Sequence, residues 1–337
     1  MTLIPGDGVG PEITEALILV FQALGQPFHW KHAEMGLGAF EKYGDPLPAR
    51  TIQSIESTRL AIKGPVETPL ISGFQSPLLR LRKHFELFAN VRPSQILLKD
   101  HLNDDKVDML MVRENMEGLY SAEETYLPVG DDPHGIAQAT AYNSRIGCER
   151  ILRFAFDLAQ TQRRRKVTVV HKANVLKKLS GIFLQTAREL YGSSEYAQTF
   201  EYEEMIVDAC AMQMAMNRSF FDVIVTTNMF GDILSDLAAG LTGGIGMAPC
   251  MNIGKNCALF EPVHGSAPGI AGKGIANPIA LLLSGALMLL HVGKHDEASR
   301  LRSAIDKALN EDLVRTPDLG GNASTYEMAT AVARHLG

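Results

Sequence analysis

Short apolar runs alternate with amphipathic stretches along this chain, and that alternation limits the folds it can adopt. Val167–Val170 and Val223–Thr227 are short and apolar, as buried strands are. Pro11–Leu24, Ser144–Gln160 and Ser180–Tyr191 carry apolar residues at helical spacing. Strands that alternate with helices build a sheet with helices packed on it. The sequence therefore predicts an α/β protein.

Length, charge and cysteine usage narrow the class further. The 337 residues are enough for about two domains. A net charge of -6 argues against a nucleic-acid partner. The most apolar run, Ile279–Leu290, is too short to cross a bilayer, so we expect a buried helix and no membrane association. The cysteines lack the spacing of a zinc site or a disulfide framework, which predicts reduced thiols in a cytoplasmic protein. They are Cys148, Cys210, Cys250 and Cys257.

Two carboxylates stand out in the segment Asn228–Asp236. Asp232 and Asp236 are four residues apart, so a helix would place both on one face. Two acids there repel each other unless a cation lies between them. Carboxylate oxygens are ligands that suit Mg²⁺ or Mn²⁺. The spacing fits a metal site, with a solvated helix face as the alternative.

Three arginines form a second candidate group: Arg82, Arg92 and Arg113. Arg92 and Arg113 lie beside strand-like segments, where an arginine is seldom buried without an anion. A guanidinium group pairs with a carboxylate through two parallel hydrogen bonds. A di- or tricarboxylate substrate would explain several of these arginines at once. The alternative is internal ion pairs with Glu86, Glu114 or Glu117.

Lys172 is the third candidate, in His171-Lys172-Ala173-Asn174. It follows the predicted strand Val167–Val170, and α/β proteins place ligands at the carboxyl ends of strands. A buried lysine can have a lowered pKa and act as a base. An ordinary surface lysine is the alternative.

Two glycine-rich loops complete the set. Gly6–Pro11 joins a strand to a helix, but it lacks the third glycine and the later acid of a dinucleotide-binding fingerprint. A Rossmann loop is therefore not expected. Glu261–Pro278 is rich in small residues, which let a ligand approach the backbone. Taken alone, it is a loop before the helix at Ile279–Leu290.

Together these segments resemble the β-decarboxylating dehydrogenase family of isocitrate, homoisocitrate and 3-isopropylmalate dehydrogenases. The likeness covers nearly the whole chain and keeps the order of the motifs, ending with Pro317–Gly321. It implies a two-domain fold that is not a Rossmann fold, and a homodimer with shared active sites. Residues 1–96 and 243–337 would form a large domain with the dinucleotide site. Residues 97–242 would form a small domain with the dimer interface.

The resemblance also implies a role for each candidate residue. Lys172 would help to remove the hydroxyl proton of a 2-hydroxy tricarboxylate, and Tyr120 would protonate the enolate carbon. The substrate would be bound by Ser76, Arg82, Arg92 and Arg113. Mg²⁺ or Mn²⁺ would be held by Asp232, Asp236 and the partner subunit's Asp208. The dinucleotide would be bound by Thr68, His264, Gly265, Ser266, Ala267, Ile270 and Asn277.

The substrate within the family is less sharply indicated. Lys63–Pro69 and Ser76 are similar to isocitrate enzymes, but Leu78 replaces an asparagine that those enzymes carry. The Ser76-Pro77 pair and Glu117–Tyr120 look more like homoisocitrate enzymes. A 3-isopropylmalate pocket needs an apolar wall facing the γ-group, and Leu78 and Leu79 could supply one. The chain as a whole looks most like compact bacterial NAD-type isocitrate dehydrogenases, so we expect isocitrate, with the other two acids as alternatives.

The cofactor and the class of subunit follow from further positions. Gly269 replaces the acid that NAD-type members usually carry, and Gly269-Ile270 replaces the Lys-Tyr pair of NADP-type members. Cationic partners for a 2′-phosphate are missing near Pro317–Gly321, so we expect NAD. The alternative to an enzyme is a non-catalytic regulatory subunit of a heteromeric isocitrate dehydrogenase. Such subunits lose metal or base residues, and this sequence keeps them.

Overall fold

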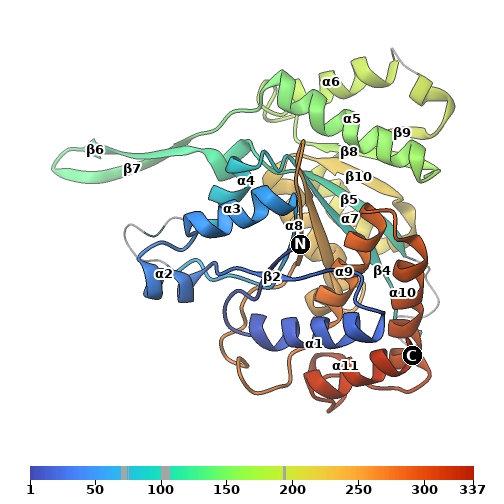
Figure 1. Cartoon of the computed structure of the whole chain (residues 1–337). Helices are drawn as coiled ribbons and strands as arrows, with labels where there is room; N and C mark the ends of the chain where they lie inside the picture. Colours follow the sequence, from blue (N-terminus) through green and yellow to red (C-terminus); the bar gives the residue numbers. More distant parts are fainter. Residues whose placement is uncertain (70–73, 75, 100–106, 193–194) are drawn as a thin grey trace. The chain divides into compact units, whose positions relative to one another are not determined.

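The computed structural model describes residues 1–69, 74, 76–99, 107–192 and 195–337, which fold into two compact units (Figure 1). The first unit contains Met1–Leu87, Arg92–Val107 and Ala239–Gly337. The second contains Phe88–Val91 and Asp108–Ala238. Leu97–Lys99 and residues 239–242, which we expected in the small domain, belong to the first unit. Phe88–Val91, which we expected in the large domain, belong to the second.

A mostly parallel sheet organises the first unit. Its strands lie in the order β2 (Lys31–His32), β1 (Thr2–Ile4), β3 (Leu60–Lys63), β12 (Ala258–Pro262) and β11 (Pro249–Ile253). Only the β11–β12 pair in this series is antiparallel. The helices are α1 (Gly10–Ala23), α2 (Leu37–Tyr43), α3 (Ala49–Thr58), α4 (Pro77–His84), α9 (Ile279–His291), α10 (His295–Asn310) and α11 (Thr325–Arg334).

Helix α9 is the centre of the first unit's core. Every residue from Ile279 to Leu289 is buried, because the helix is apolar all round. It packs with α1 and α10, and Gly285 lets the Phe21 ring approach its backbone. The expected buried helix is confirmed. Among the described residues, no helix is both long and apolar enough to cross a membrane.

The second unit contains four parallel strands in the order β5 (Asp108–Glu114), β10 (Val223–Thr226), β8 (Lys166–His171) and β9 (Glu201–Ile206). Its helices are α5 (Arg145–Thr161), α6 (Gly181–Gly192), α7 (Val207–Met216) and α8 (Asn228–Leu241), whose last three residues belong to the first unit. Strand β4 (Ala89–Gln95) is divided between the units. The predicted strands and helices are confirmed, with ends that differ by a residue or so.

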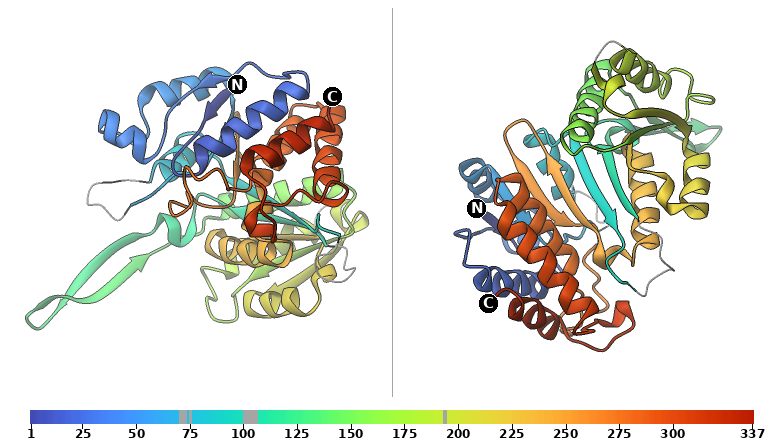
Figure 2. Two further views of the ribbon diagram at one scale, coloured as in Figure 1. Left: turned by 90° about the horizontal axis from the view of Figure 1, so that it is seen from below. Right: turned by 90° about the vertical axis from the view of Figure 1, so that its right-hand side faces the viewer.

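A long hairpin extends from the helices and strands of the second unit (Figures 1 and 2). It consists of β6 (Glu123–Val129) and β7 (Asp132–Thr140), and every residue of both strands is exposed. Four of the exposed side chains are large and apolar: Tyr126, Leu127, Val129 and Ile136.

The Gly6–Pro11 loop is a packing junction in the first unit. Gly8 has a φ of +59°, and a Cβ there would lie 2.0 Å from the Ser266 carbonyl oxygen. At Gly10 a Cβ would lie 2.1 Å from the Pro5 carbonyl oxygen. The Asp7 carboxylate accepts hydrogen bonds from the backbone N–H groups of Leu37, Gly38 and Glu67. These glycines therefore serve close backbone packing.

Replacing Gly10 with Ala should lower the free energy of unfolding by at least about 2 kcal/mol, because the added methyl group meets a fixed carbonyl oxygen. Gly181→Ala is the matched control. Gly181 is also the first residue of a helix, but nothing lies within 4 Å of a Cβ there. Its free energy of unfolding should stay the same or rise by up to about 1 kcal/mol. Urea denaturation measures both; equal stabilities would contradict the packing argument.

Candidate active site

Arg113, Asn228 and Asp232 come together because their segments follow neighbouring strands of the second unit. Arg113 lies near the carboxyl end of β5 and is paired in register with Thr226 of β10. Asn228 begins α8 directly after β10. Carboxyl ends of parallel strands meet at one edge of a sheet, where α/β proteins bind ligands. The side chains of all three face one another there.

Asp232 lies between a buried cation and a phenol. Arg113, whose side chain is 2% exposed, donates through Nη1 to Asp232 Oδ1, and the Tyr120 hydroxyl donates to Oδ2. The guanidinium carbon lies 5.2 Å from the centre of the Tyr120 ring. Gly231 permits this packing, since a Cβ there would lie 2.6 Å from Arg113 Cγ. Arg113 thus pairs with an aspartate that the sequence had suggested only as a metal ligand.

The donor set on α8 suits a hard divalent ion. Asp232 and Asp236 are one helical turn apart; the Asp232 side chain is 32% exposed and Asp236 is exposed. Carboxylate oxygens at a partly open position match the ligands that Mg²⁺ and Mn²⁺ take. In the described part of one chain, no group of three His, Cys, Asp or Glu side chains is placed to hold a metal. A complete site would need further donors.

Lys172 and Asp208 form a separate ion pair. Lys172 follows β8, and Asp208 lies in the first turn of α7 after β9, the strand next to β8. Lys172 Nζ donates to Asp208 Oδ1, and this hydrogen bond holds the pKa of Asp208 below its usual range. The Lys172 side chain is 27% exposed, so it is not fully buried. The pair is open to solvent.

Most of the candidate dinucleotide residues line one cavity of about 720 Å³ in the first unit. They are His264, Gly265, Ala267, Ile270 and Asn277. Val9 and Asp318 also line it, and sequence reasoning had given neither a role. Ser266 is buried and donates to Glu67, while Thr68 is exposed; neither lines the described cavity.

The cavity combines apolar walls with a few fixed polar groups. His264 Nδ1 lies 2.9 Å from the Gly265 carbonyl oxygen, and its buried Nε2 has no hydrogen-bond partner. Burial lowers the pKa of His264, so the ring is neutral at neutral pH. Asp318 accepts hydrogen bonds from Asn277 Nδ2 at 3.0 Å and Thr316 Oγ1 at 2.6 Å. An apolar cavity with such groups suits a flat, polar heterocycle.

Arg82 belongs to a buried charged cluster in the first unit. Lys63 Nζ lies 2.6 Å from Glu261 Oε2, and Arg82 Nη2 lies 3.9 Å from Glu261 Oε1. Asn252 donates to the same carboxylate at 2.7 Å. Burial would raise the pKa of Glu261, but Lys63 and Arg82 hold it below its usual range. Two buried cations therefore share one carboxylate, and Arg82 Nε is buried without a hydrogen-bond partner.

The remaining candidate substrate residues lie on nearby elements of the same unit. Ser76 is the N-cap of α4, where its hydroxyl accepts from the Leu79 N–H at 3.5 Å. Arg92 lies on β4 and is 8% exposed. The Lys63–Glu261 pair could not be predicted from the sequence, because the fold brings these distant residues together.

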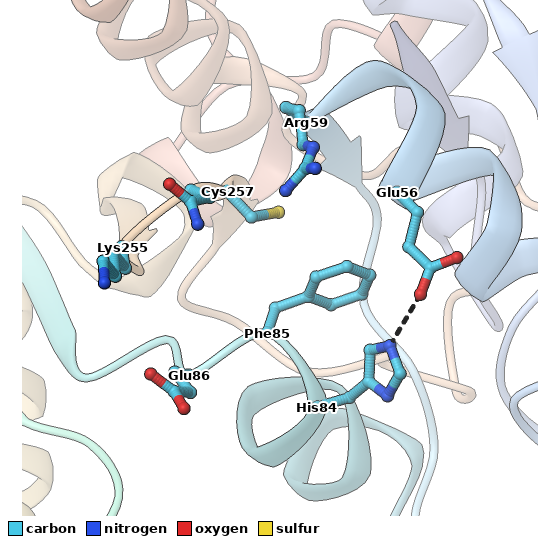
Figure 3. Close-up of a pocket in the computed structure, with 8 residues that line it drawn as sticks. Glu56, Arg59, His84, Phe85, Glu86, Lys255 and Cys257 are labelled. Carbon is cyan, nitrogen blue, oxygen red and sulfur yellow. Dashed lines mark hydrogen bonds and ion pairs between the residues drawn. The ribbon is translucent and has the colours of Figure 1, made fainter.

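A further cavity, of about 570 Å³, lies elsewhere in the first unit (Figure 3). His84 and Glu56 on its wall are joined at 3.1 Å. Arg59, Lys255 and Cys257 also line it. It contains none of the candidate site residues.

Comparison with known proteins gives a consistent result. The family model for isocitrate/isopropylmalate dehydrogenase matches residues 1–332. The 3-isopropylmalate dehydrogenase of Archaeoglobus fulgidus is 43% identical over 100% of this chain and 99% of its own. The isocitrate/homoisocitrate dehydrogenase of Thermus thermophilus is 44% identical over 99% of this chain and 97% of its own. The crystal structure of isocitrate dehydrogenase from Methylococcus capsulatus has a TM-score of 0.93 and 46% identity, covering 99% of this chain and 98% of that one.

Replacing Lys63 with Met should lower the free energy of unfolding by about 3 kcal/mol near neutral pH, because Glu261 loses its main buried cation. In the native protein Glu261 has a lowered pKa, so its contribution is present above its ordinary value of 4.5 and is lost in acid. In the variant burial raises that pKa, so Glu261 takes up a proton as the pH falls. The stability difference should therefore shrink towards about pH 5.

The control is Lys42→Met, which removes an exposed ion pair with Glu34. It should change stability little at any pH. Urea denaturation across this pH range measures both variants. A Lys63→Met cost that is small, or that grows on acidification, would show that the buried pair is not the stabilising contact.

Proposed function

The chain belongs to the isocitrate/isopropylmalate dehydrogenase family, and on that premise we propose that it converts isocitrate to 2-oxoglutarate by oxidative decarboxylation, using NAD and Mg²⁺ or Mn²⁺. The family consists of NAD-dependent decarboxylating dehydrogenases. The observation that carries the proposal is the Asp232 cluster: a carboxylate between a buried guanidinium group and a phenol. It combines an anion-binding group, a proton donor and a metal-ligand carboxylate at one position.

The arginines bind the carboxylates of the substrate in this proposal. Arg113 is buried and has a fixed plane, which suits bidentate pairing with a carboxylate. Arg82 lies in a cluster with more cations than anions, so an anionic ligand would balance its charge. Arg92 adds a third cation on β4. Ser76 would meet the γ-carboxylate at the N-terminus of α4, where the helix dipole favours negative charge.

Asp232, Asp236 and the partner subunit's Asp208 would hold the metal. When bound there, a divalent ion lowers the pKa of the substrate hydroxyl and stabilises the negative charge that develops on loss of CO₂. Asp232 also orients Tyr120, because its carboxylate accepts a hydrogen bond from the Tyr120 hydroxyl. The two functions are linked through one carboxylate.

The proton transfers fall to Lys172 and Tyr120. Lys172 would accept the hydroxyl proton of the substrate in the partner's site, where bound NAD would supply the hydride acceptor. Tyr120 would donate a proton to the carbon that loses CO₂. Both side chains are partly exposed, so they are accessible to a substrate. The cavity lined by His264, Ile270 and Asn277 would hold the adenine end of NAD.

A homodimer with shared sites completes the proposal, since Lys172 and Asp208 would act in the partner's site. The exposed apolar side chains of the β6–β7 hairpin support contact with a second copy. Met212 and Met216 on α7 and Ile233 on α8 are also apolar and exposed. The four cysteines are free and buried, which supports a reducing compartment such as the cytoplasm.

3-Isopropylmalate is the second candidate substrate. Leu79 on α4 is 40% exposed, beside the Ser76 cap, and could contact an apolar γ-group. Homoisocitrate differs from isocitrate by one methylene group in the γ-side chain, so the same cap could serve it. A regulatory subunit is disfavoured because Tyr120, Lys172 and the three aspartates are all present.

Steady-state kinetics of the purified chain with Mn²⁺ tests the function. Isocitrate, homoisocitrate and 3-isopropylmalate are compared, each with NAD and with NADP. We expect the highest kcat/KM for isocitrate with NAD. A higher kcat/KM for homoisocitrate or 3-isopropylmalate would identify that acid as the substrate instead. Inactivity with all three acids would contradict the proposed activity.

Gly269→Asp should lower the KM for NAD several-fold. The position lies beside Ile270 of the cavity and nothing lies within 4 Å of a Cβ there, so a carboxylate can be accommodated to bond the ribose hydroxyls. Gly269→Asn is the control for added size without charge. Direct titration with NAD measures both; equal affinities for wild type and Gly269→Asp would show that the ribose is held elsewhere.

A further inference from the structure

Asn228 joins three elements of the second unit at the Asp232 cluster. It is the first residue of α8 and is 2% exposed. Its Oδ1 accepts hydrogen bonds from Arg113 Nε at 3.1 Å and Nη2 at 2.7 Å. Its Nδ2 donates to the Glu117 carbonyl oxygen at 3.1 Å. One amide side chain thus connects β5, α8 and the segment that leads to Tyr120.

The contact with Arg113 fixes the plane of the guanidinium group. Asn228 takes one edge of that group, and Asp232 accepts from Nη1. Bidentate pairing with a carboxylate requires the guanidinium plane to be held in one orientation. Asn228 does this without adding a second negative charge beside Arg113, which already pairs with Asp232. An acid at this position would hold the same plane but would repel a substrate carboxylate.

The contact with Glu117 fixes the start of the turn that carries Tyr120. The Glu117 carboxylate accepts from Ser144 N and Ser144 Oγ, each at 2.6 Å, at the N-terminus of α5. Its carbonyl oxygen is held by Asn228. Tyr120 lies in the short helix Gly118–Ser121 that follows directly. Both ends of Glu117 are therefore fixed immediately before the phenol.

We propose that Asn228 is a positioning residue that orients Arg113 towards a substrate carboxylate and Tyr120 towards the carbon it protonates. The inference rests on the proposed function, which gives Arg113 and Tyr120 those roles. Asn228 itself acts through these two neighbours. Its neutral amide is the required chemistry, because it supplies an acceptor to one neighbour and a donor to the other.

Two substitutions test the role of the Asn228 amide. Asn228→Asp keeps the shape and the acceptor oxygen, but sets a carboxylate against Arg113 and removes the donor to Glu117. It should raise the KM for the hydroxy acid by about tenfold or more, and leave the KM for NAD within about twofold. Asn228→Ala removes the contacts with both neighbours. Since both variants lose the donor to Glu117, both should also lower kcat by about tenfold or more. A general loss of stability would not raise the KM for the hydroxy acid while leaving the KM for NAD unchanged.

The matched control is Asn143→Ala in the same unit. The Asn143 amide also donates to a backbone carbonyl, that of Leu179 at 2.7 Å. The variant should leave both KM values within about twofold, whatever its melting temperature. Kinetic constants of Asn228→Asp and Asn228→Ala within about twofold of wild type would overturn the inference, as would equal rises in the KM for NAD and for the acid.

Calorimetric titration with malate, the shared core of the three acids, separates this inference from the proposed function. It reports carboxylate binding without turnover. If the wild type binds malate but oxidises none of the three acids, the proposed function fails while Asn228 can still be judged. Asn228→Asp should then weaken malate binding by about tenfold, and unchanged binding, or no binding by the wild type, would overturn the inference.

Discussion

The buried guanidinium group of Arg113 is the constraint on which the site depends. A buried cation costs several kcal/mol in lost hydration, and only well-placed partners offset that cost. Asp232 and Asn228, both on α8, are two such partners here. The interaction that stabilises the packing of β5 against α8 therefore also holds the carboxylate to which Tyr120 bonds. Folding the second unit and arranging its chemistry are one process.

The first unit also holds a buried arginine with a carboxylate, but there two cations surround one carboxylate. The Glu261 carboxylate lies between the buried cations Lys63 and Arg82, and the shorter contact is with Lys63. Arg82 is left with a buried Nε that has no hydrogen-bond partner. In each unit, then, an arginine expected to bind substrate is held in place by a carboxylate of its own unit.

Sequence patterns predict the local elements well and the long-range pairings poorly. Apolar periodicity identified α1, α5, α6 and α9, because burial of one face or of the whole helix is written into adjacent residues. The spacing of Asp232 and Asp236 placed them correctly on one helix face. The pairing of Arg113 with Asp232 spans 119 residues and depends on β5 lying next to β10, which no local pattern encodes. Asp318 was missed for the same reason.

We propose that Asp232 serves both Arg113 and a divalent metal. Titration of Mn²⁺ in the presence of isocitrate, followed by the electron paramagnetic resonance of free Mn²⁺, tests it in wild type and in Asp232→Asn. The account predicts that the variant, although folded, binds Mn²⁺ at least about tenfold more weakly. Equal Mn²⁺ affinity in the two proteins would contradict it.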